Sequence, residues 1–340
     1  MSFKSSKELW CATLYKVLHK ALGMKRPHAT AGTAAFSAWL QTKFPANTWH
    51  TDGAGNMHVD LREDAKRHRT LFVAHVDTVH KTTGKNTYSQ VEKWEVKAVG
   101  EAIGGTIIAK GDALGADDGA GVALLMHMMS HGIPAYYLFT QGEERGGIGA
   151  KFVAKHYSKV LVEMDRAIAF DRRGTDSVIT YQGFSRCCSD AFGDALAQEL
   201  NDNAANFFYS PDPSGVYTDT AEFTELISEC TNISVGYDHE HTTKECLDVA
   251  HYHALAKAVL AVRWDELPVR RDPMVEDTMY AKSKWADWGG GLTYLGDANN
   301  EPYKYQPHDL YGLTRQQMIN LAYDSPELFV DMVRDEMGLR

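Results

Sequence analysis

Residues 70–78 read TLFVAHVDT, and this stretch decides the fold. Its first six residues form a continuous apolar segment, a pattern typical of a strand buried in a parallel sheet. The segment ends in a polar cluster that contains His75 and Asp77. Open α/β sheets keep their functional groups at the carboxyl ends of their strands, so the stretch predicts a site at that edge of an α/β sheet.

Three further apolar segments behave in the same way. Segment 135–139 is followed by Glu143 and Glu144, segment 166–170 by Asp171, and segment 232–235 by the run GYDHEH at 236–241. The alternation of such strands with helical patterns predicts a three-layer α/β/α domain with a mixed, mostly parallel central sheet. We expect helices at 1–22, 33–44, 121–129 and 246–265, and a hairpin of two strands within 48–61.

Composition narrows the classes of function. The 340 residues include no apolar run near the roughly 18 that a membrane span needs, so we expect no membrane contact. A formal charge of -10 without clustered lysine and arginine argues against a nucleic-acid partner. Five scattered cysteines without CxxC spacing argue against a disulfide framework, and we expect a reducing, cytoplasmic setting.

The polar clusters carry the chemistry of a metal site. Histidine and carboxylate side chains are zinc ligands, and a two-metal site needs a carboxylate that bridges ions about 3.5–4 Å apart. His75 and Asp77 lie on one face of an extended segment, so the carboxylate can orient an imidazole that binds metal. Taken alone, each cluster has a simpler interpretation, such as a solvated strand end or, for Asp117 and Asp118, a helix N-cap.

In chain order, five motifs resemble those of the co-catalytic zinc exopeptidases, which include aminopeptidases, tripeptidases and glutamate carboxypeptidases. The motifs are His75-Val76-Asp77, Gly115-Ala116-Asp117-Asp118, Glu143-Glu144, Phe170-Asp171 and Glu240-His241-Thr242. The resemblance covers residues 5–262 and does not extend into the C-terminal segment.

The resemblance implies a role for each of these residues. Asp117 bridges two metal ions, His75 and Asp171 complete one site, and Glu144 and His241 complete the other. Glu143 is then the general base, Asp77 orients His75, and Asp118 shapes the turn. The implied cofactors are two divalent ions, zinc by default, with cobalt or manganese also admitted by these ligands.

Details of the sequence select a branch of this superfamily. Gly119 stands where tripeptidase-like and deacylase-like members usually have lysine, which favours the aminopeptidase branch. Asp171 and His241 are 241 − 171 = 70 positions apart, too few to hold an inserted lid or dimerisation domain. We therefore expect a lid-less catalytic domain at 1–267 and an extension of unknown role at 268–340, with helices at 314–323 and 326–336.

Several assignments stay open at this point. His239 competes with His241 for the last ligand position, and the pattern of histidine, threonine and glutamate at 241–245 favours His241. Asp219 is either an N-cap or part of the substrate site, and Arg172 or Arg173 either binds a substrate carboxylate or balances the acidic cluster. Tyr237 or His239 is a candidate for stabilising the oxyanion. The remaining histidines considered, His50, His58, His80, His127 and His131, receive no role.

The expected reaction is hydrolysis of a peptide or amide bond. Two cations lower the pKa of a shared water, Glu143 takes its proton, and the leaving amine receives that proton. The substrate is a peptide if the enzyme is an aminopeptidase. The alternatives are a deacylase or carboxypeptidase that acts on N-acyl amino acids or peptides, and an inactive binding protein on the same scaffold.

Overall fold

A computed structural model describes residues 6–91, 96–97, 101–102, 105–204, 206–275 and 277. The chain divides into two compact units, one of residues 1–182 with 187–276 and one of residues 183–186 with 277–340. The described part of the second unit is strand β14 (Ser185–Arg186), its two preceding residues and Asp277, whose carboxylate accepts a hydrogen bond from Arg186. The helices predicted at 314–323 and 326–336 lie outside the described residues.

The first unit is built on an eight-stranded sheet. Its strands run in the order β15 (Ser210–Asp212), β12 (Ser177–Ile179), β16 (Glu229–Ser234), β11 (Arg166–Arg172), β4 (Thr70–His75), β10 (Tyr136–Thr140), β3 (Met57–Asp60) and β2 (His50–Thr51). The four strands from β16 to β10 are parallel to one another, whereas β12, β3 and β2 pair antiparallel with their neighbours β16, β10 and β3. This mixed, largely parallel sheet confirms the predicted fold class.

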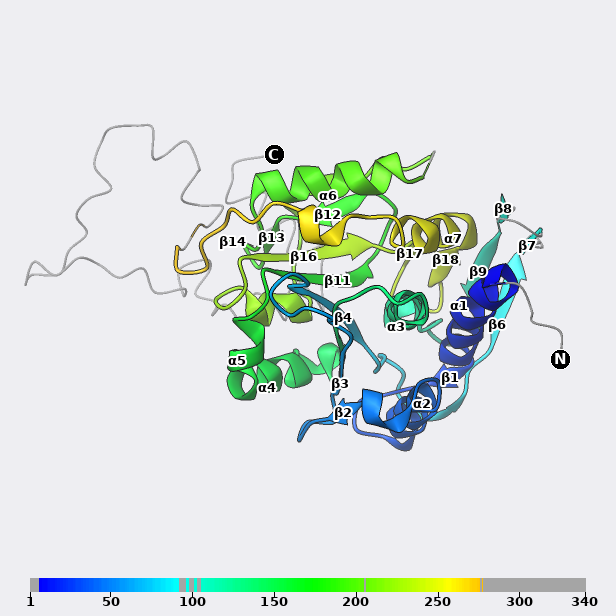
Figure 1. The fold of residues 1–340 in the computed structure, drawn as a ribbon. Coiled ribbons are helices and arrows are strands. Elements are labelled where there is room, and N and C mark those ends of the chain that lie inside the picture. Colours follow the sequence, from blue (N-terminus) through cyan, green and yellow to red (C-terminus); the bar gives the residue numbers. More distant parts are fainter. Residues whose placement is uncertain are drawn as a thin grey trace, which may run out of the picture. The chain divides into compact units, whose positions relative to one another are not determined.

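The central strands bury both of their faces. Along β4, Phe72 and Ala74 belong to one hydrophobic cluster, and Leu71 and Val73 belong to a second cluster on the opposite face. Side chains alternate across a strand, so an uninterrupted apolar run requires cover on both sides. Helices α3 (Ala116–Ser130) and α7 (Val249–Ala258) supply one layer, and α4 (Ile148–His156) and α5 (Ser158–Leu161) supply the other, as Figure 1 shows.

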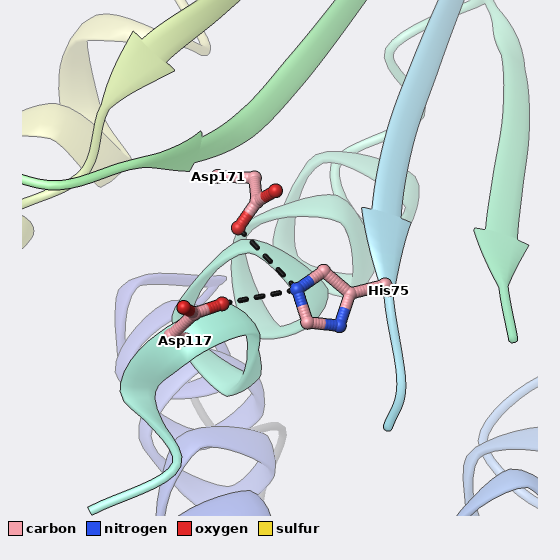
Figure 2. Close-up of side chains that lie close together, drawn as sticks. All are labelled: His75, Asp117 and Asp171. Carbon is pink, nitrogen blue, oxygen red and sulfur yellow. Dashed lines mark hydrogen bonds and ion pairs between the residues drawn. The ribbon is translucent and has the colours of Figure 1, made fainter. Parts of the chain in front are cut away.

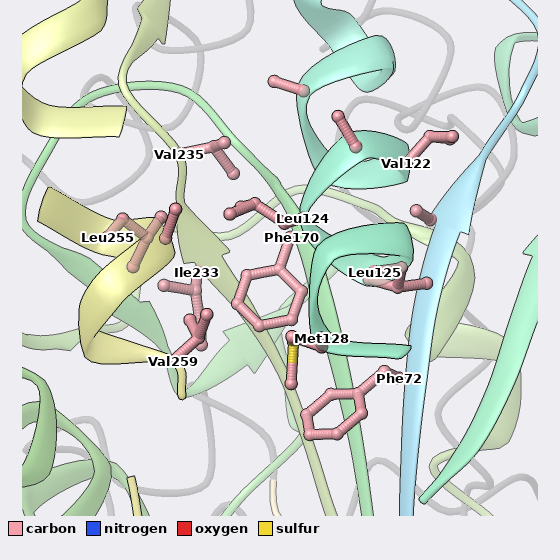
Figure 3. Close-up of a cluster of buried hydrophobic side chains, with 14 of the residues drawn as sticks. Phe72, Val122, Leu124, Leu125, Met128, Phe170, Ile233, Val235, Leu255 and Val259 are labelled. Carbon is pink, nitrogen blue, oxygen red and sulfur yellow. The ribbon is translucent and has the colours of Figure 1, made fainter. Parts of the chain in front are cut away.

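Helix α3 fills the larger of the two clusters. Every residue of this helix from its start to Met129 is buried, and Figure 3 shows its side chains in one cluster with Phe72 and Phe170 of the sheet and Leu255 of α7. Apart from the two acids of its first turn and His127, the helix is apolar on all sides, which suits it to the interior. Its first turn, which carries Asp117, is therefore held rigidly beside the sheet.

Three more helices complete the unit: α1 (Ser6–Leu22), α2 (Ala31–Gln41) and α6 (Asp190–Asp202). Helix α1 packs against α3, and α2 begins at a capping box made by Thr30 and Thr33. The hairpin predicted within 48–61 is present as β2 and β3. The short elements are β1 (Met24–Lys25), β5 (Gly84–Lys85), β7 (Val96–Lys97), β8 (Glu101–Ala102), β13 (Tyr181–Gln182), η1 (Ala46–Thr48), η2 (Glu143–Arg145), η3 (Asp219–Phe223) and η4 (Trp264–Glu266).

A second sheet corrects one sequence prediction. It contains β17 (Tyr237–Asp238), β18 (Cys246–Asp248), β9 (Thr106–Ala109) and β6 (Tyr88–Val91), in that order. Residues 246–248 were predicted to begin a helix, which is wrong, because Leu247 pairs with Ile107 in this sheet. The helix starts only after Asp248, whose side chain accepts the backbone N–H of His251 as an N-cap.

Candidate metal centre

Parallel strands bring the predicted ligands to one edge of the sheet. His75 is the last residue of β4, and Asp171 is the next-to-last residue of β11, its direct neighbour. Glu143 and Glu144 open the 3₁₀ turn η2 just beyond β10, on the other side of β4. The carboxyl ends of parallel strands meet at the same edge, so these side chains converge although the chain separates them widely.

The first group of candidate ligands is His75, Asp117 and Asp171, shown in Figure 2. One ligand atom from each lies within 4.8 Å of the other two. His75 Nε2 is 3.0 Å from Asp117 Oδ1 and 3.4 Å from Asp171 Oδ1. One imidazole and two carboxylates around a common point form a ligand set that suits a divalent transition metal.

The second group is Asp117, Glu144 and His241, whose ligand atoms also lie within 4.8 Å of one another. His241 Nε2 is 3.0 Å from Asp117 Oδ2 and 3.1 Å from Glu144 Oε2. Asp117 therefore turns one carboxylate oxygen toward each histidine. A carboxylate shared in this way is the feature that a two-metal site requires.

His241 reaches this group by an unusual backbone conformation. Its φ angle is +63° and that of His239 is +55°, both in the left-handed region that side chains other than glycine rarely adopt. The structure places His241 beside Asp117 and Glu144, whereas His239 is exposed and belongs to neither candidate group. The structure thus brings His241, and not His239, beside the other candidate ligands.

Asp77 connects His75 with the loop that follows β10. Its Oδ1 lies 3.6 Å from His75 Nδ1 and accepts the backbone N–H groups of Gly142 and Glu143 at 2.7 and 3.3 Å. The carboxylate is fully buried. It thus lies behind the imidazole, as the sequence suggested, and also holds the backbone of Glu143, which the sequence did not indicate.

Asp118 shapes the first turn of α3. One carboxylate oxygen accepts the N–H of Gly121 and the other accepts the N–H of His75, both at 3.0 Å. The peptide bond between Asp117 and Asp118 is cis. The N-cap of α3 is Gly115, without a side-chain cap, and Asp118 joins the first turn of the helix to the end of β4. Asp117 faces the two histidines.

Asp171 is held by the side chains of Thr218, Asn232 and Tyr237. Thr218 Oγ1 donates to its Oδ2 at 2.8 Å, and the Tyr237 hydroxyl donates to its Oδ1 at 3.1 Å. Asn232 Oδ1 accepts the backbone N–H of Asp171 at 2.8 Å, and Asn232 Nδ2 donates to the carbonyl of Asp171 at 2.7 Å. Tyr237, considered above for the oxyanion, is thus engaged with a candidate ligand. No local sequence signal links these residues, because each lies 47 to 66 positions from Asp171.

Asn56 braces the loop that carries Glu143 and Glu144. Its Oδ1 accepts the N–H of Gln141 at 2.9 Å, and its Nδ2 donates to the carbonyl of Gly149 at 3.1 Å. These contacts hold both ends of the loop. Asn56 is completely buried, and Asp52 in turn fixes its amide at 2.7 Å.

The charges of the site call for a cation. Burial raises the pKa of Asp171 and Glu144, and neighbouring carboxylates add to that effect. Burial also acts to lower the pKa of His75 and His241, but the surrounding acids outweigh it and raise both values. A bound divalent cation would supply the positive charge that these acids otherwise draw from protons. The residues therefore fit a metal site by their chemistry as well as their geometry.

Glu143 stands beside both groups without belonging to either. Its side chain is buried, and its Oε2 lies 4.0 Å from His75 Nε2. Burial raises its pKa well above the ordinary value, and Asp171 and Asp219 contribute in the same direction. A buried carboxyl of this kind, next to the candidate ligands, is suited to proton transfer.

The residues whose roles the sequence left undecided make the following contacts in the structure. Asp219 is buried and accepts a hydrogen bond from Thr140, and burial raises its pKa to about 7. Arg172 pairs with Asp212 and Arg173 with Glu240, each at 3.3 Å. The histidines without an expected role lie in other contacts: His50 with Tyr157, His58 with Asp52 and Tyr136, His80 with Thr78 and Ala113, His127 with Ala256, and His131 with Ser130.

A sheet edge that gathers imidazoles and buried carboxylates around one shared aspartate defines the class of this protein, a metal-dependent hydrolase of the α/β type. The model of Peptidase family M28 matches residues 56–264, so the chain belongs to this family of peptidases. Every candidate ligand lies within the matched residues, and members of the family depend on metal.

Solved structures share the fold at low sequence identity. An aminopeptidase PepT from Bacillus cereus is 15% identical, with a TM-score of 0.55 over 75% of this chain and 98% of its own. An aminopeptidase from Desulfurococcus kamchatkensis is 15% identical, with a TM-score of 0.54 over 76% and 98%. A tripeptidase from Staphylococcus aureus is 16% identical, with a TM-score of 0.54 over 74% and 97%. No curated protein sequence matches the chain. Among the described residues, no helix combines the length and apolar character that crossing a membrane requires.

Proposed function

We propose that the chain is an aminopeptidase that hydrolyses the first peptide bond of its substrate with two divalent cations, zinc by default. The observation that carries this proposal is the sharing of Asp117 between two ligand groups. In this assignment His75 and Asp171 complete one cation site with Asp117, and Glu144 and His241 complete the other. Cobalt or manganese would suit the same nitrogen and oxygen ligands.

The proposed division of labour separates binding from proton transfer. Bound at these positions, two cations lower the pKa of water and polarise a carbonyl group. Glu143 accepts the proton of the attacking water and returns it to the leaving amine. Asp77 keeps the Glu143 backbone in place through the N–H groups of residues 142 and 143. The low exposure of Glu143 keeps bulk water from competing for that proton.

The choice of an aminopeptidase over a deacylase or carboxypeptidase is supported by the ion pairs of the two arginines that follow Asp171. A substrate with a free carboxyl terminus needs an uncommitted arginine or lysine. The two arginines that follow Asp171 are both committed, Arg172 to Asp212 and Arg173 to Glu240. The similar structures, two aminopeptidases and a tripeptidase, also support a preference for free amino termini.

The test combines metal content with substrate choice. Purified protein is analysed for metals and assayed on matched peptides with free and with N-acetylated amino termini. We expect about two ions per chain, cleavage of the free peptides only, and loss of cleavage in Glu143→Gln. Because Glu143 belongs to neither ligand group, that variant should keep its metals and its melting temperature.

Other results of the same assays would indicate a different function. Cleavage restricted to acetylated peptides would show that the protein is a deacylase and not an aminopeptidase. Cleavage that begins at the carboxyl terminus and weakens in Arg173→Ala would indicate a carboxypeptidase. A fully metallated protein that cleaves nothing on a broad peptide panel would be a binding protein on this scaffold.

Two further parts of the proposal concern organisation and location. We propose a lid-less catalytic domain followed by an extension at 268–340. In support, β12, α6, β15 and β16, which lie between Asp171 and His241 in the chain, all belong to the first unit, and only residues 183–186 of this stretch belong to the second. We also propose a cytoplasmic location, which the free thiols of Cys187, Cys230 and Cys246 support. Cell fractionation would test it, and recovery from an oxidising compartment would contradict it.

A further inference from the structure

One carboxylate gathers four consecutive backbone N–H groups at the start of α3. Glu245 Oε2 accepts the N–H groups of Leu114 and Gly115 at 2.7 and 3.1 Å, and its Oε1 accepts those of Ala116 and Asp117 at 2.7 and 3.1 Å. The side chain is 1% exposed. The loop that delivers Asp117 is therefore wrapped around this carboxylate.

Glu245 belongs to the segment that delivers the other shared ligand. It follows His241 by four positions, and its own N–H donates to the carbonyl of Thr242 at 3.2 Å, which closes a turn. Its carbonyl accepts the N–H of Ala109 at 2.8 Å, so strand β9 anchors the turn. A single side chain thus joins the segment of His241 to the loop of Asp117.

Arg26 holds the same loop through the carbonyl group of Gly115. Its Nη2 donates to the carbonyl of Gly115 at 3.2 Å, and its Nε donates to the carbonyl of Val76 at 2.9 Å. Both the N–H and the C=O of Gly115 are therefore fixed, by Glu245 and Arg26 respectively. Gly115 has a φ of +75°, where a larger residue would be strained, so this peptide has little freedom to adjust.

We propose that Glu245 is a positioning residue that sets the separation of Asp117 and His241, so that both can bind the same cation. The inference rests on the proposed two-metal function. Glu245 lies in neither candidate ligand group and touches only backbone N–H groups at the site, so it acts through the ligands it holds. Residues that orient ligands typically raise metal affinity about 10- to 100-fold.

The chain offers a matched control in Glu229. This carboxylate is also completely buried and also accepts four donors: the N–H and hydroxyl of Ser189 and the N–H groups of Arg270 and Arg271. Glu229 is the first residue of β16, whereas His75 and Asp171 lie at the other ends of the parallel strands β4 and β11. Replacing it disturbs a similar network far from the ligands.

The experiment compares Glu245→Gln with Glu229→Gln. Each protein is stripped of metal with a chelator and titrated with Zn²⁺ against a competing indicator and with Co²⁺ by visible absorption. Urea unfolding of the same samples measures stability. We expect both variants to be less stable, but only Glu245→Gln to bind Zn²⁺ at least about tenfold more weakly and to change the Co²⁺ spectrum.

The outcomes separate this inference from the function on which it rests. Wild-type protein that binds no Zn²⁺ would end the two-metal proposal itself. Wild-type protein that binds two ions, with Glu245→Gln equal to it in affinity and spectrum, would reduce Glu245 to a purely structural role. Should Glu245→Gln fail to fold, Glu245→Asp, which keeps the charge but shortens the reach, is expected to show the same loss of affinity, and wild-type affinity in that variant would overturn the inference.

Discussion

At the scale of single residues, the candidate ligands depend on buried polar side chains that bond to backbone. Asn56 is the clearest case in the 141–149 loop, because it binds Gln141 on one side of Glu143 and Gly149 on the other. A buried backbone group that loses its partner costs about 1–3 kcal/mol, so such a loop keeps its shape only while the brace is present.

Replacing Asn56 with alanine should therefore impair catalysis more than stability alone would explain. We expect a loss of about 1–3 kcal/mol in unfolding free energy and a fall in kcat approaching 100-fold, since small displacements of reacting groups have effects of that size. Urea unfolding and peptide hydrolysis measure the two effects.

Asn201→Ala is the control for Asn56. Asn201 lies in α6 and also makes two bonds to backbone, both to Tyr209, at 2.8 and 2.9 Å. The Asn201→Ala variant should be less stable than the wild type, but its kcat should stay near the wild-type value. Equal kcat values in the two variants would mean that Asn56 does not position the loop.

These braces also mark the limit of what the sequence could predict at this scale. Every candidate ligand could be named because it belongs to a short motif beside an apolar segment, and these motifs together resemble those of the co-catalytic zinc exopeptidases. Glu245 could be named as part of the 241–245 motif, but its contacts could not be predicted, and Arg26 could not be named at all, because the partners of both are backbone groups as far as 131 and 89 positions away. Backbone N–H and C=O groups are the same in every residue, so such contacts leave no trace in the pattern.

At the scale of elements, the contact between α3 and α7 contains a buried imidazole. His127 is completely buried in α3, and its Nε2 lies 3.1 Å from the carbonyl of Ala256 in α7, to which it donates. Burial lowers the pKa of His127 to about 3, and the neighbouring His131 adds to that effect. The imidazole is therefore neutral in the folded protein over most of the pH range.

This shift makes stability depend on pH in a definite direction. The unfolded chain protonates His127 near pH 6.5 and the folded chain only near pH 3, so stability should fall as the pH drops through this window. One such group contributes about 1.4 kcal/mol per pH unit.

His127→Gln keeps a donor for Ala256 but does not titrate. Its urea unfolding free energy, measured at pH 7, 6, 5 and 4, should fall less steeply than that of the wild type, by about 1 kcal/mol per pH unit below pH 6. Other acid-sensitive groups are shared by both proteins and cancel in the comparison. Parallel curves would show that His127 is not the group responsible.

Elements were predictable where their pattern was strong and local. The buried strands β4, β10 and β11 and the apolar helix α3 could be predicted because their hydrophobic runs suit a single environment. Residues 246–248 were misassigned because their apolar spacing also suits a helix, and only the pairing of Leu247 with Ile107, 140 positions earlier, selects the strand. Local pattern cannot express a pairing at that distance.

At the scale of the whole molecule, the first unit continues past the end of the family match at residue 264. The backbone N–H groups of Arg270 and Arg271 donate to the buried Glu229 at 2.6 and 3.0 Å. The Arg271 guanidinium donates to four carbonyls, those of Cys187, Thr224, Ile227 and Ser228. Residues just beyond the predicted domain boundary are thus part of the support of β16.

The position of a truncation should therefore decide its effect. A chain that ends after Val275 keeps these contacts and should unfold close to the wild-type temperature. A chain that ends after Leu267 leaves Glu229 and the four carbonyls without these partners, which should cost at least about 3 kcal/mol and lower Tm by about 6–12 °C. Full-length Arg271→Ala should reproduce part of that loss.

Because only the longer truncated chain preserves the support of β16, its peptide hydrolysis, compared with that of the full chain, reports whether residues 276–340 contribute to catalysis. Equal stability of the two truncated chains would contradict the anchoring role of Arg270 and Arg271.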